Sequence, residues 1–305
     1  MNVFRSTFLS LSEMHGLRHL AENSTVARNV SRRFVAGESV QDALKVCNEA
    51  NQLGLAVTLD ALGENVTDEA RARATEALYI NVLNQIADMK LNANVSLKLT
   101  QVGIDLGYGL AESIVRNLSR HACTMGNFVR VDMEGSAYTE KTLRLVKCLH
   151  GSSGVDNSIG AVVQAYLYRT EGDVDDLIAR GIRIRLCKGA YLEPETIAFP
   201  DKRDVDANYV RSMKKMLTSG IFHGLATHDE AIIREAQEFA TERRIDRSSF
   251  EFQMLYGIRR DLQVSLVQQG FRVRVYVPFG DEWYPYFMRR LAERPANAPD
   301  RRRVS

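Results

Sequence analysis

The sequence alternates short apolar segments with amphipathic helical segments, and this alternation constrains the fold more than any other feature. Segments with the length and composition of buried strands span residues 54–62, 93–100, 128–134, 160–168, 182–188, 224–228, 249–255 and 271–278. Segments with helical periodicity follow them at 68–90, 110–124, 139–149, 174–179, 207–218, 230–242, 259–268 and 282–293. Eight such units predict parallel βαβ connections that close into an α/β fold of the (βα)8 barrel type.

An open doubly wound sheet is the structural alternative to the barrel. It is disfavoured because no GxGxxG motif follows the first strand, and the Gly107-Tyr108-Gly109 segment lacks the third glycine. About fifty residues precede the barrel, with predicted helices at 5–22, 26–35 and 40–52. We therefore expect an N-terminal helical region (1–53), a catalytic barrel (54–293) and a flexible basic tail (294–305).

Charge and cysteine content exclude several classes of protein. The 40 basic and 38 acidic residues are mixed along the chain, which argues against a nucleic-acid-binding protein. Four scattered cysteines have neither metal-ligand nor disulfide spacing, which fits a reducing cytoplasm. Neither a signal peptide nor a membrane-spanning stretch is evident. We expect a cytoplasmic protein, with any membrane contact peripheral and helped by the basic cluster at 301–303.

Polar residues gather where the predicted strands end. In a (βα)8 barrel the active site forms at the C-terminal ends of the strands. Each residue taken singly is typical of a solvated rim or a structural ion pair, but together they indicate an active site. The set comprises Asp60, Glu64, Lys98, Asp132, Glu134, Gln164, Arg185, Lys188, Thr227, His228 and Tyr276.

Three chemistries could use this set. Asp132 and Glu134 lie on one strand face and could bind a metal with His228 and Asp229. Against this, the histidines form no HxH or HExxH pair and several cations lie nearby. A second possibility is a Schiff-base lyase that uses Lys98 or Lys188 as its amine. A third is a flavin or another phosphate-bearing cofactor, which the segment 185–191 (RLCKGAY) suits with its two cations and a glycine. Spacing alone leaves the last two open.

The last predicted helix is unusual for a barrel. Tyr286, Arg289, Arg290 and Glu293 form one stripe along it, at a position where the final helix normally presents aliphatic residues to the sheet. The stripe could be a solvated face with Arg289 paired to Glu293. Alternatively, the helix lies over the barrel mouth and presents two guanidinium groups to a small carboxylate on an apolar ring.

Eight segments, in order along the chain, resemble the proline dehydrogenase family, including the dehydrogenase domain of bifunctional proline-utilisation flavoproteins. They are residues 62–64 (LGE), 96–98 (SLK), 131–134 (VDME), 164–166 (QAY), 185–191 (RLCKGAY), 226–229 (ATHD), 251–257 (EFQMLYG) and 286–293 (YFMRRLAE). The length is similar to that of the stand-alone bacterial members. This sequence departs from the usual pattern at Cys187, Leu192 and Asp229, where many members have valine, tryptophan and asparagine.

The resemblance implies FAD-dependent oxidation of L-proline to Δ1-pyrroline-5-carboxylate, the first step of proline catabolism, with electrons passed to a membrane quinone. It also implies a separate pyrroline-5-carboxylate dehydrogenase. A proline-binding module without catalysis is the non-enzymatic alternative. No residue is identified as the base that deprotonates the substrate amine.

The resemblance also implies roles for residues on the substrate side. Lys98, Arg289 and Arg290 would bind the proline carboxylate, while Asp132 and Tyr276 would organise the network around Lys98. The pocket for the proline ring would be shaped by Ala190, Tyr191, Leu255 and Tyr286. Glu64 would pair with Arg289 and help to close the site.

On the cofactor side, Arg185 and Gln164 would contact the flavin near its reactive edge. Lys188 would bind the pyrophosphate beside Gly189 and Ala190, and Thr227 and His228 would lie toward the adenosine. A cation near the flavin ring would stabilise the negative charge that develops on reduction, which is the role implied for Arg185.

Overall fold

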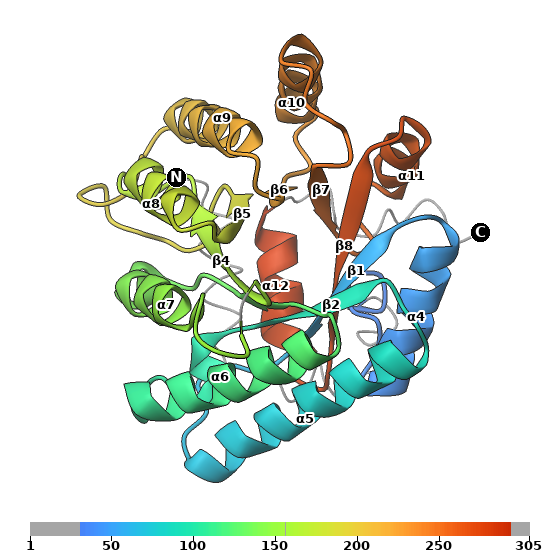
Figure 1. The fold of residues 1–305 in the computed structure, drawn as a ribbon, viewed down its shortest axis with the longest axis vertical. Helices are drawn as coiled ribbons and strands as arrows, with labels where there is room; N and C mark the ends of the chain where they lie inside the picture. Colours follow the sequence, from blue (N-terminus) through green and yellow to red (C-terminus); the bar gives the residue numbers. More distant parts are fainter. Residues whose placement is uncertain (1–30, 156, 294–305) are drawn as a thin grey trace.

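The structure, a computed structural model, describes residues 31–155 and 157–293. Eight parallel strands form a closed barrel in chain order, with β8 paired to β1. Helices form a ring around the strands (Figure 1). The strands are β1 (Ala56–Ala61), β2 (Ala93–Leu97), β3 (Val129–Val131), β4 (Ile159–Gln164), β5 (Arg183–Cys187), β6 (His223–Ala226), β7 (Phe250–Leu255) and β8 (Arg272–Phe279). The predicted (βα)8 barrel is confirmed.

The helices lie between the strands, as the sequence predicts. They are α4 (Val40–Gln52), α5 (Glu69–Asp88), α6 (Tyr108–Thr124), α7 (Ser136–Leu149), α8 (Thr170–Ala179), α9 (Lys202–Thr218), α10 (Glu230–Glu242), α11 (Arg260–Gln268) and α12 (Trp283–Glu293). The structure adds a short 3-10 helix, η1 (Leu99–Val102), directly after β2. Among the helices, the largest differences in boundary are at α8 and α9, which begin four and five residues before their predicted starts.

Helix α4 confirms the last of the three helices predicted before the barrel. Ser39 caps it: the Ser39 hydroxyl accepts from the Asp42 amide at 3.1 Å, and the Asp42 carboxylate accepts from the Ser39 amide at 3.2 Å. Its buried side chains include Leu44 and Cys47. The predicted helix 5–22, the first half of the helix 26–35 and the tail 294–305 lie outside the described residues. In the second half of 26–35, Ser31 is helical and residues 32–35 form a turn and a bend, so the predicted helix is too long at this end.

The apolar core lies between the strands and the surrounding helices. Alternate strand residues such as Leu59 and Leu97 point outward and are fully buried, together with Leu83 and Ile86 of α5. The other half of each strand faces the barrel interior and is largely polar. There Thr58 donates to the side chain of Asn94 at 2.6 Å, for example. Apolar side chains therefore pack between the barrel and the helices, and hydrogen-bonded polar side chains fill the barrel interior.

Helix α12 covers the C-terminal end of the barrel. Its apolar residues, including Trp283 and Phe287, form a separate buried cluster with Phe34. Leu62 and Leu255, which lie at the C-terminal ends of β1 and β7, pack against that cluster. In Figure 1 this helix projects onto the barrel, inside the ring formed by the others. The predicted placement of the last helix over the barrel mouth is confirmed.

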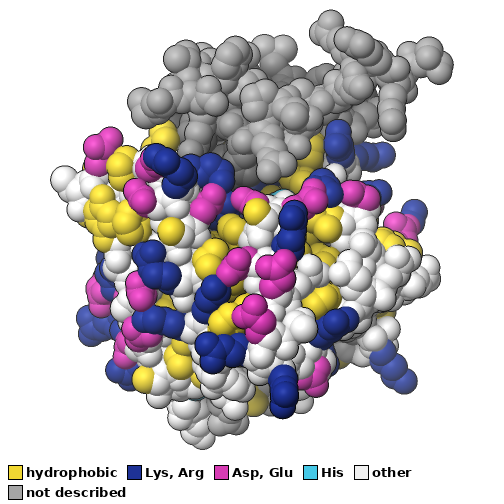
Figure 2. Space-filling view, turned by 90° about the horizontal axis from the view of Figure 1, so that it is seen from above, with side chains coloured by type: hydrophobic (Ala, Val, Ile, Leu, Met, Phe, Trp, Pro, Cys, Tyr) yellow, Lys and Arg dark blue, Asp and Glu magenta, His cyan; other side chains and the backbone are white. Residues whose placement is uncertain are grey.

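Basic and acidic side chains are interspersed on the face shown in Figure 2. This mixing agrees with the charge pattern of the sequence. Within residues 31–155 and 157–293, no helix combines the length and apolar character that crossing a membrane requires.

Candidate active site

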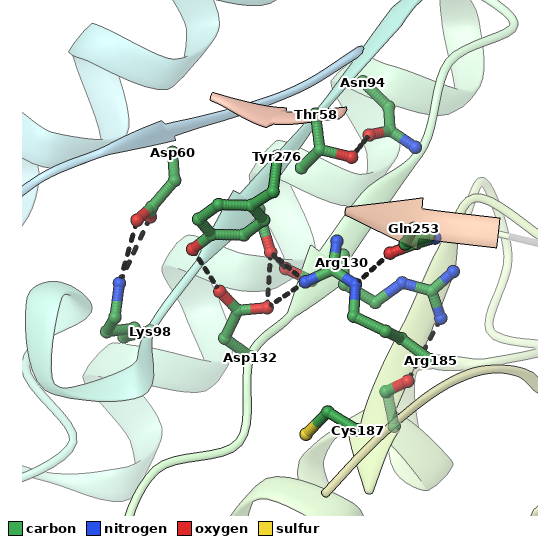
Figure 3. A network of polar contacts seen from close by, with 12 residues as sticks. Thr58, Asp60, Asn94, Lys98, Arg130, Asp132, Arg185, Cys187, Gln253 and Tyr276 are labelled. Carbon is green, nitrogen blue, oxygen red and sulfur yellow. Dashed lines mark hydrogen bonds and ion pairs between the residues drawn. The ribbon is translucent and has the colours of Figure 1, made fainter. Parts of the chain in front are cut away.

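Asp132 is the centre of a polar network at the C-terminal end of the barrel. Its carboxylate accepts hydrogen bonds from the Ser96 hydroxyl at 2.6 Å, the Arg185 Nη1 at 2.7 Å and the Tyr276 hydroxyl at 2.7 Å. The Arg185 guanidinium also lies over the Tyr276 ring, 5.2 Å from its centroid. Burial and the nearby carboxylates raise the pKa of Tyr276, so its hydroxyl remains a donor. Figure 3 shows Asp132 between Tyr276 and Arg185.

Lys98 and Asp60 form a second, neighbouring pair. The Lys98 Nζ lies 3.1 and 3.2 Å from the two carboxylate oxygens of Asp60 (Figure 3). Asp60 is completely buried and Lys98 is 9% exposed. Burial alone would lower the pKa of Lys98, but the negative charges of Asp60, Glu64 and Asp132 outweigh it and the net shift is upward. Lys98 is therefore an ammonium ion at neutral pH.

The role that the resemblance implies for Asp132 and Tyr276, organising the network around Lys98, stays a prediction. Both side chains lie close by: Asp132 is hydrogen-bonded to Ser96, Arg185 and Tyr276, and its charge helps to raise the pKa of Lys98. Asp60 is the direct partner of Lys98. The reason is register: Asp60 pairs with Ser96 across β1 and β2, so Lys98, two residues further on the same face, extends beside Asp60.

Arg185 connects this network to the barrel interior. Its Nε donates to the Gln253 side chain, whose amide nitrogen donates to Glu251 at 2.6 Å. Glu251 in turn accepts from the Arg274 Nε at 2.7 Å. All four side chains are at most 9% exposed. The guanidinium of Arg185 is held on several sides, which fixes the position of its charge.

The predicted cofactor residues lie at or just beyond the C-terminal ends of three neighbouring strands, β4, β5 and β6. Gln164 ends β4 and donates to the Glu134 carbonyl at 2.9 Å. Beyond β6, the buried Thr227 hydroxyl accepts from the Asp229 amide at 3.0 Å. The His228 Nε2 accepts from the Leu255 amide at 2.9 Å. With Arg185 and Lys188 of the β5 region, these residues occupy one continuous arc of the barrel mouth.

Lys188 is held between two carboxylates. Its Nζ donates to Asp206 of α9 and, at 2.8 Å, to Asp229. Lys202 pairs with the same two carboxylates from the outside. Burial opposes ionisation of Asp229, but hydrogen bonding and charge from Lys188 give a net lowering of its pKa. The ammonium group of Lys188, which is predicted to bind a cofactor pyrophosphate, is therefore also bound by two protein carboxylates.

The segment after β5 turns at Gly189. Its φ of +114° is unfavourable for other residues, and a Cβ there would lie 2.3 Å from the Tyr166 ring. Only glycine allows the chain to cross Tyr166 at this point. Ala190 and Tyr191 follow and are partly exposed.

Helix α12 contributes Tyr286 and Arg290 on its barrel side. Tyr286 is 7% exposed, and the Arg290 guanidinium lies 5.1 Å from the centroid of its ring. Glu64 and Leu255, at the ends of β1 and β7, are also partly buried. The side chain of Arg289 lies outside the described residues, so its predicted pairing with Glu64 stays a prediction.

Glu134, a member of the predicted set, accepts two hydrogen bonds from Thr100 at 3.2 and 2.6 Å, and burial raises its pKa.

Two polar residues of the network, Ser96 and Gln253, were absent from the predicted set. Ser96 and Gln253 bind the central carboxylate and Arg185. The available signal was strand alternation, since Ser96 lies two residues before Lys98 and Gln253 two residues before Leu255.

The residues of the site fit a flavin better than a metal. Among the described residues, no group of three or more His, Cys, Asp or Glu side chains is arranged to hold a metal ion. In contrast, the arc from β4 to β6 combines two cations, a glutamine amide and a hydroxyl, which suits a cofactor with a polar ring edge and a pyrophosphate. Lys98, Tyr276 and α12 form the opposite side of the mouth.

Comparison with known proteins gives the family. The family model described as proline dehydrogenase matches residues 43–303. The chain belongs to the proline dehydrogenase family. As a member it is an oxidoreductase. Proline dehydrogenase 2 of Bacillus subtilis strain 168 is 40% identical over 295 residues, which cover 97% of this chain and 96% of that protein. The proline dehydrogenase of Deinococcus radiodurans is also 40% identical, over 97% of this chain and 96% of its own length.

Larger relatives contain the same barrel as one part. The bifunctional protein PutA of Escherichia coli K12 is 25% identical over 88% of this chain, but the match covers only 24% of PutA. The crystal structure of proline utilization A from Bdellovibrio bacteriovorus, inactivated by N-propargylglycine, superposes with a TM-score of 0.83 at 26% identity. That match covers 96% of this chain and 36% of the other.

Proposed function

We propose that this chain oxidises L-proline to Δ1-pyrroline-5-carboxylate with FAD as its cofactor. The observation that carries the proposal is the division of the barrel mouth into two arcs. Residues suited to a flavin lie at the ends of β4, β5 and β6, and residues suited to a small carboxylate lie on β2, β8 and α12. Family membership supports the same assignment.

On the substrate side, Lys98 and Arg290 bind the proline carboxylate. The raised pKa of Lys98 keeps its ammonium group charged, and arginine is always protonated in proteins. Tyr286, against the Arg290 guanidinium, supplies an apolar surface for the pyrrolidine ring, together with Tyr191, Ala190 and Leu255. Arg289 contributes a second guanidinium, and Glu64 helps to close the site. Two cations and an aromatic wall orient the ring in one way.

The reaction removes a hydride from C5 and a proton from the amine, and a carbon–nitrogen double bond forms between these atoms. Bound FAD supplies the acceptor for the hydride and its two electrons. The proton leaves to water. Arg185 places a fixed positive charge at the cofactor side of the mouth, held by Asp132 and Gln253. Its charge stabilises the negative charge that reduction creates, with little reorganisation.

Lys188 binds the pyrophosphate, with Gly189 and Ala190 beside it. Gln164 hydrogen-bonds the cofactor ring, and Thr227 and His228 lie toward the adenosine. The Schiff-base alternative is disfavoured because both candidate lysines are paired with carboxylates. An ammonium ion with a raised pKa, such as Lys98, is a poor nucleophile.

The electrons leave to a membrane quinone. We propose a cytoplasmic protein that contacts the inner face of the cell membrane peripherally, with the basic cluster at 301–303 as one contact. A separate pyrroline-5-carboxylate dehydrogenase consumes the product.

Turnover with a soluble quinone tests the proposal. Purified protein with its cofactor is mixed with L-proline and a short-chain quinone, and both quinone reduction and pyrroline-5-carboxylate are measured. We expect equimolar quinol and product, with D-proline as a poor substrate. Product without quinone reduction would reject the acceptor, and no product with any acceptor would reject the function.

A further inference from the structure

A second constellation of charged residues lies at the opposite end of the barrel, where the strands begin. Three arginines and two phenylalanines alternate there in a stack. The guanidinium carbon of Arg130 lies 4.7 Å from the centroid of the Phe128 ring. The guanidinium carbon of Arg183 lies 4.4 Å from the centroid of the same ring and 4.8 Å from that of Phe222. Arg272 lies over Phe222 at 5.5 Å. These residues come from the starts of β3, β5, β6 and β8.

A cavity of about 340 Å³ lies beside this stack. Arg183, Arg272 and Arg274 line it, together with Phe222 and the side-chain amide residue Asn157. Arginine side chains stacked on aromatic rings keep their N–H groups at the edge of the stack, available to hydrogen-bond a ligand in the plane of the guanidinium. The lining thus combines fixed cations with an apolar surface.

Protein carboxylates of the described chain compensate the charge of this face only in part: Glu251 acts on Arg183 and Asp246 acts on Arg272 through space. Arg274 pairs with Glu251 at 2.7 Å. Arg183 and Arg272 form no ion pair with any residue in 31–155 or 157–293. The Nε atoms of Arg183 and Arg130 are buried and donate to none of those residues. Buried donors of this kind are costly unless a ligand or water accepts from them.

His223, next to Phe222, reports the positive potential of this region. Burial first, and then the charges of Arg130 and Arg183, lower its pKa to about 3. Its neutral ring accepts from the Ile184 amide at 3.0 Å. Burial, Arg185 and Arg183 likewise lower the pKa of Arg130. Crowded like charges are relieved when an anion binds among them.

We propose that this cavity binds a small oxyanion of the phosphate type. The guanidinium groups of Arg183 and Arg272 donate to its oxygens, and Asn157 adds an amide donor at the rim. Planar guanidinium groups match the oxygens of a tetrahedral oxyanion in paired hydrogen bonds, which distinguishes such a ligand from chloride. The cavity lies at the N-terminal end of the barrel, so it is separate from the candidate active site and its occupancy does not depend on the proposed reaction.

Calorimetric titration of the full chain with bound cofactor tests this proposal, using inorganic phosphate as the probe at constant ionic strength. An excess of a carboxylate analogue of proline keeps phosphate out of the active site. We expect saturable binding of one phosphate per chain that sodium chloride does not displace. Absence of saturable binding, or equal displacement by chloride, would overturn the proposal.

Two variants and a matched control locate the site. Arg272→Gln removes an exposed cation of the cavity, and Arg183→Gln removes a stacked one. Each should weaken phosphate binding about tenfold or more, because a charge-assisted hydrogen bond is lost. Arg71→Gln, on α5 with a side chain 70% exposed, removes the same charge elsewhere and should leave binding unchanged. If Arg183→Gln fails to fold, Arg272→Gln decides alone: phosphate binding at wild-type affinity in that variant overturns the assignment.

Discussion

Lys98 and Asp60 face each other across β1 and β2, with the lysine Nζ at 3.1 and 3.2 Å from the two carboxylate oxygens. The pair is buried at the C-terminal mouth of the barrel. Removing one member of a buried ion pair leaves an uncompensated charge, whereas replacing both members costs much less. This difference separates the structural role of Lys98 from its proposed role as a carboxylate ligand.

Lys98→Met should lower the free energy of unfolding by about 3–5 kcal/mol, because Asp60 loses its partner. It should also lower kcat/KM for proline about ten- to a hundredfold. The double variant Lys98→Met with Asp60→Leu should regain much of the stability but none of the kcat/KM. Urea unfolding and steady-state kinetics measure both quantities. Recovery of kcat/KM in the double variant would show that Lys98 does not bind the substrate.

Arg290→Met removes a guanidinium that we propose binds the proline carboxylate. The lost charge-assisted hydrogen bonds should lower kcat/KM about ten- to a hundredfold, while bound flavin remains. If Arg290 were only a surface residue, stability would change by under ~0.5 kcal/mol and kinetics not at all. Arg180→Met is the control, because Arg180 is half exposed at the end of α8 and paired with Asp176. Equal kcat/KM in both variants would exclude the carboxylate role.

Asp229→Asn should strengthen flavin binding. Lys188 donates to Asp229 at 2.8 Å, and that carboxylate competes with a pyrophosphate for the same ammonium group. Removing one negative charge near the phosphates should raise affinity several-fold, toward tenfold, which corresponds to roughly 1 kcal/mol. Flavin fluorescence during reconstitution of cofactor-free protein measures it. Asp175→Asn, which removes an exposed carboxylate paired with Lys215, should have no effect. Weaker flavin binding in Asp229→Asn would contradict the competition.

His223 should make the protein less stable in mild acid. Its pKa in the fold is about 3, below the ordinary value of 6.5, so between these values the unfolded chain binds a proton that the folded chain does not. Stability from this group is complete above pH 6.5 and falls as pH decreases toward 3. The loss should be about 1.4 kcal/mol per pH unit within the window.

His223→Gln keeps a hydrogen-bond acceptor for the Ile184 amide but does not titrate. Urea unfolding between pH 6 and pH 4 should therefore show a pH dependence shallower by about one proton in this variant than in the wild-type protein. Identical slopes would mean that His223 is protonated in the fold.

Much of the barrel is predictable because its strands and helices differ in hydrophobic period. The predicted helix boundaries are wrong where the first turn of a helix contains no apolar residue that would show the helical period. Helix α8 begins at Thr170, but its first turn contains Gly172 and no apolar side chain before Val174. Helix α9 begins at Lys202 after the cap residue Asp201, whose carboxylate accepts from the Arg203 amide at 2.8 Å.

The members of the active site are predictable from their positions at strand ends, but their partners are not. Lys98 pairs with Asp60 because the register of β1 and β2 places them on one face, and register is a tertiary property. In the hydrogen-bonded chain from Arg185 through Gln253 to Glu251, Arg185 and Gln253 are 68 positions apart in the sequence, whereas Gln253 and Glu251 are two apart. Sequence separation therefore gives no guide to these partners. The arginine–phenylalanine stack has no sequence signal, because its members are dispersed over four strands.

The anaerobic absorbance spectrum of the purified protein during addition of L-proline is the most direct test of the central claim. We expect the spectrum of a bound oxidised flavin, which bleaches with one equivalent of L-proline per flavin because each proline gives two electrons. D-proline should leave the spectrum unchanged. A colourless protein, or a flavin that stays oxidised in excess L-proline, would show that this chain is not an FAD-dependent proline dehydrogenase.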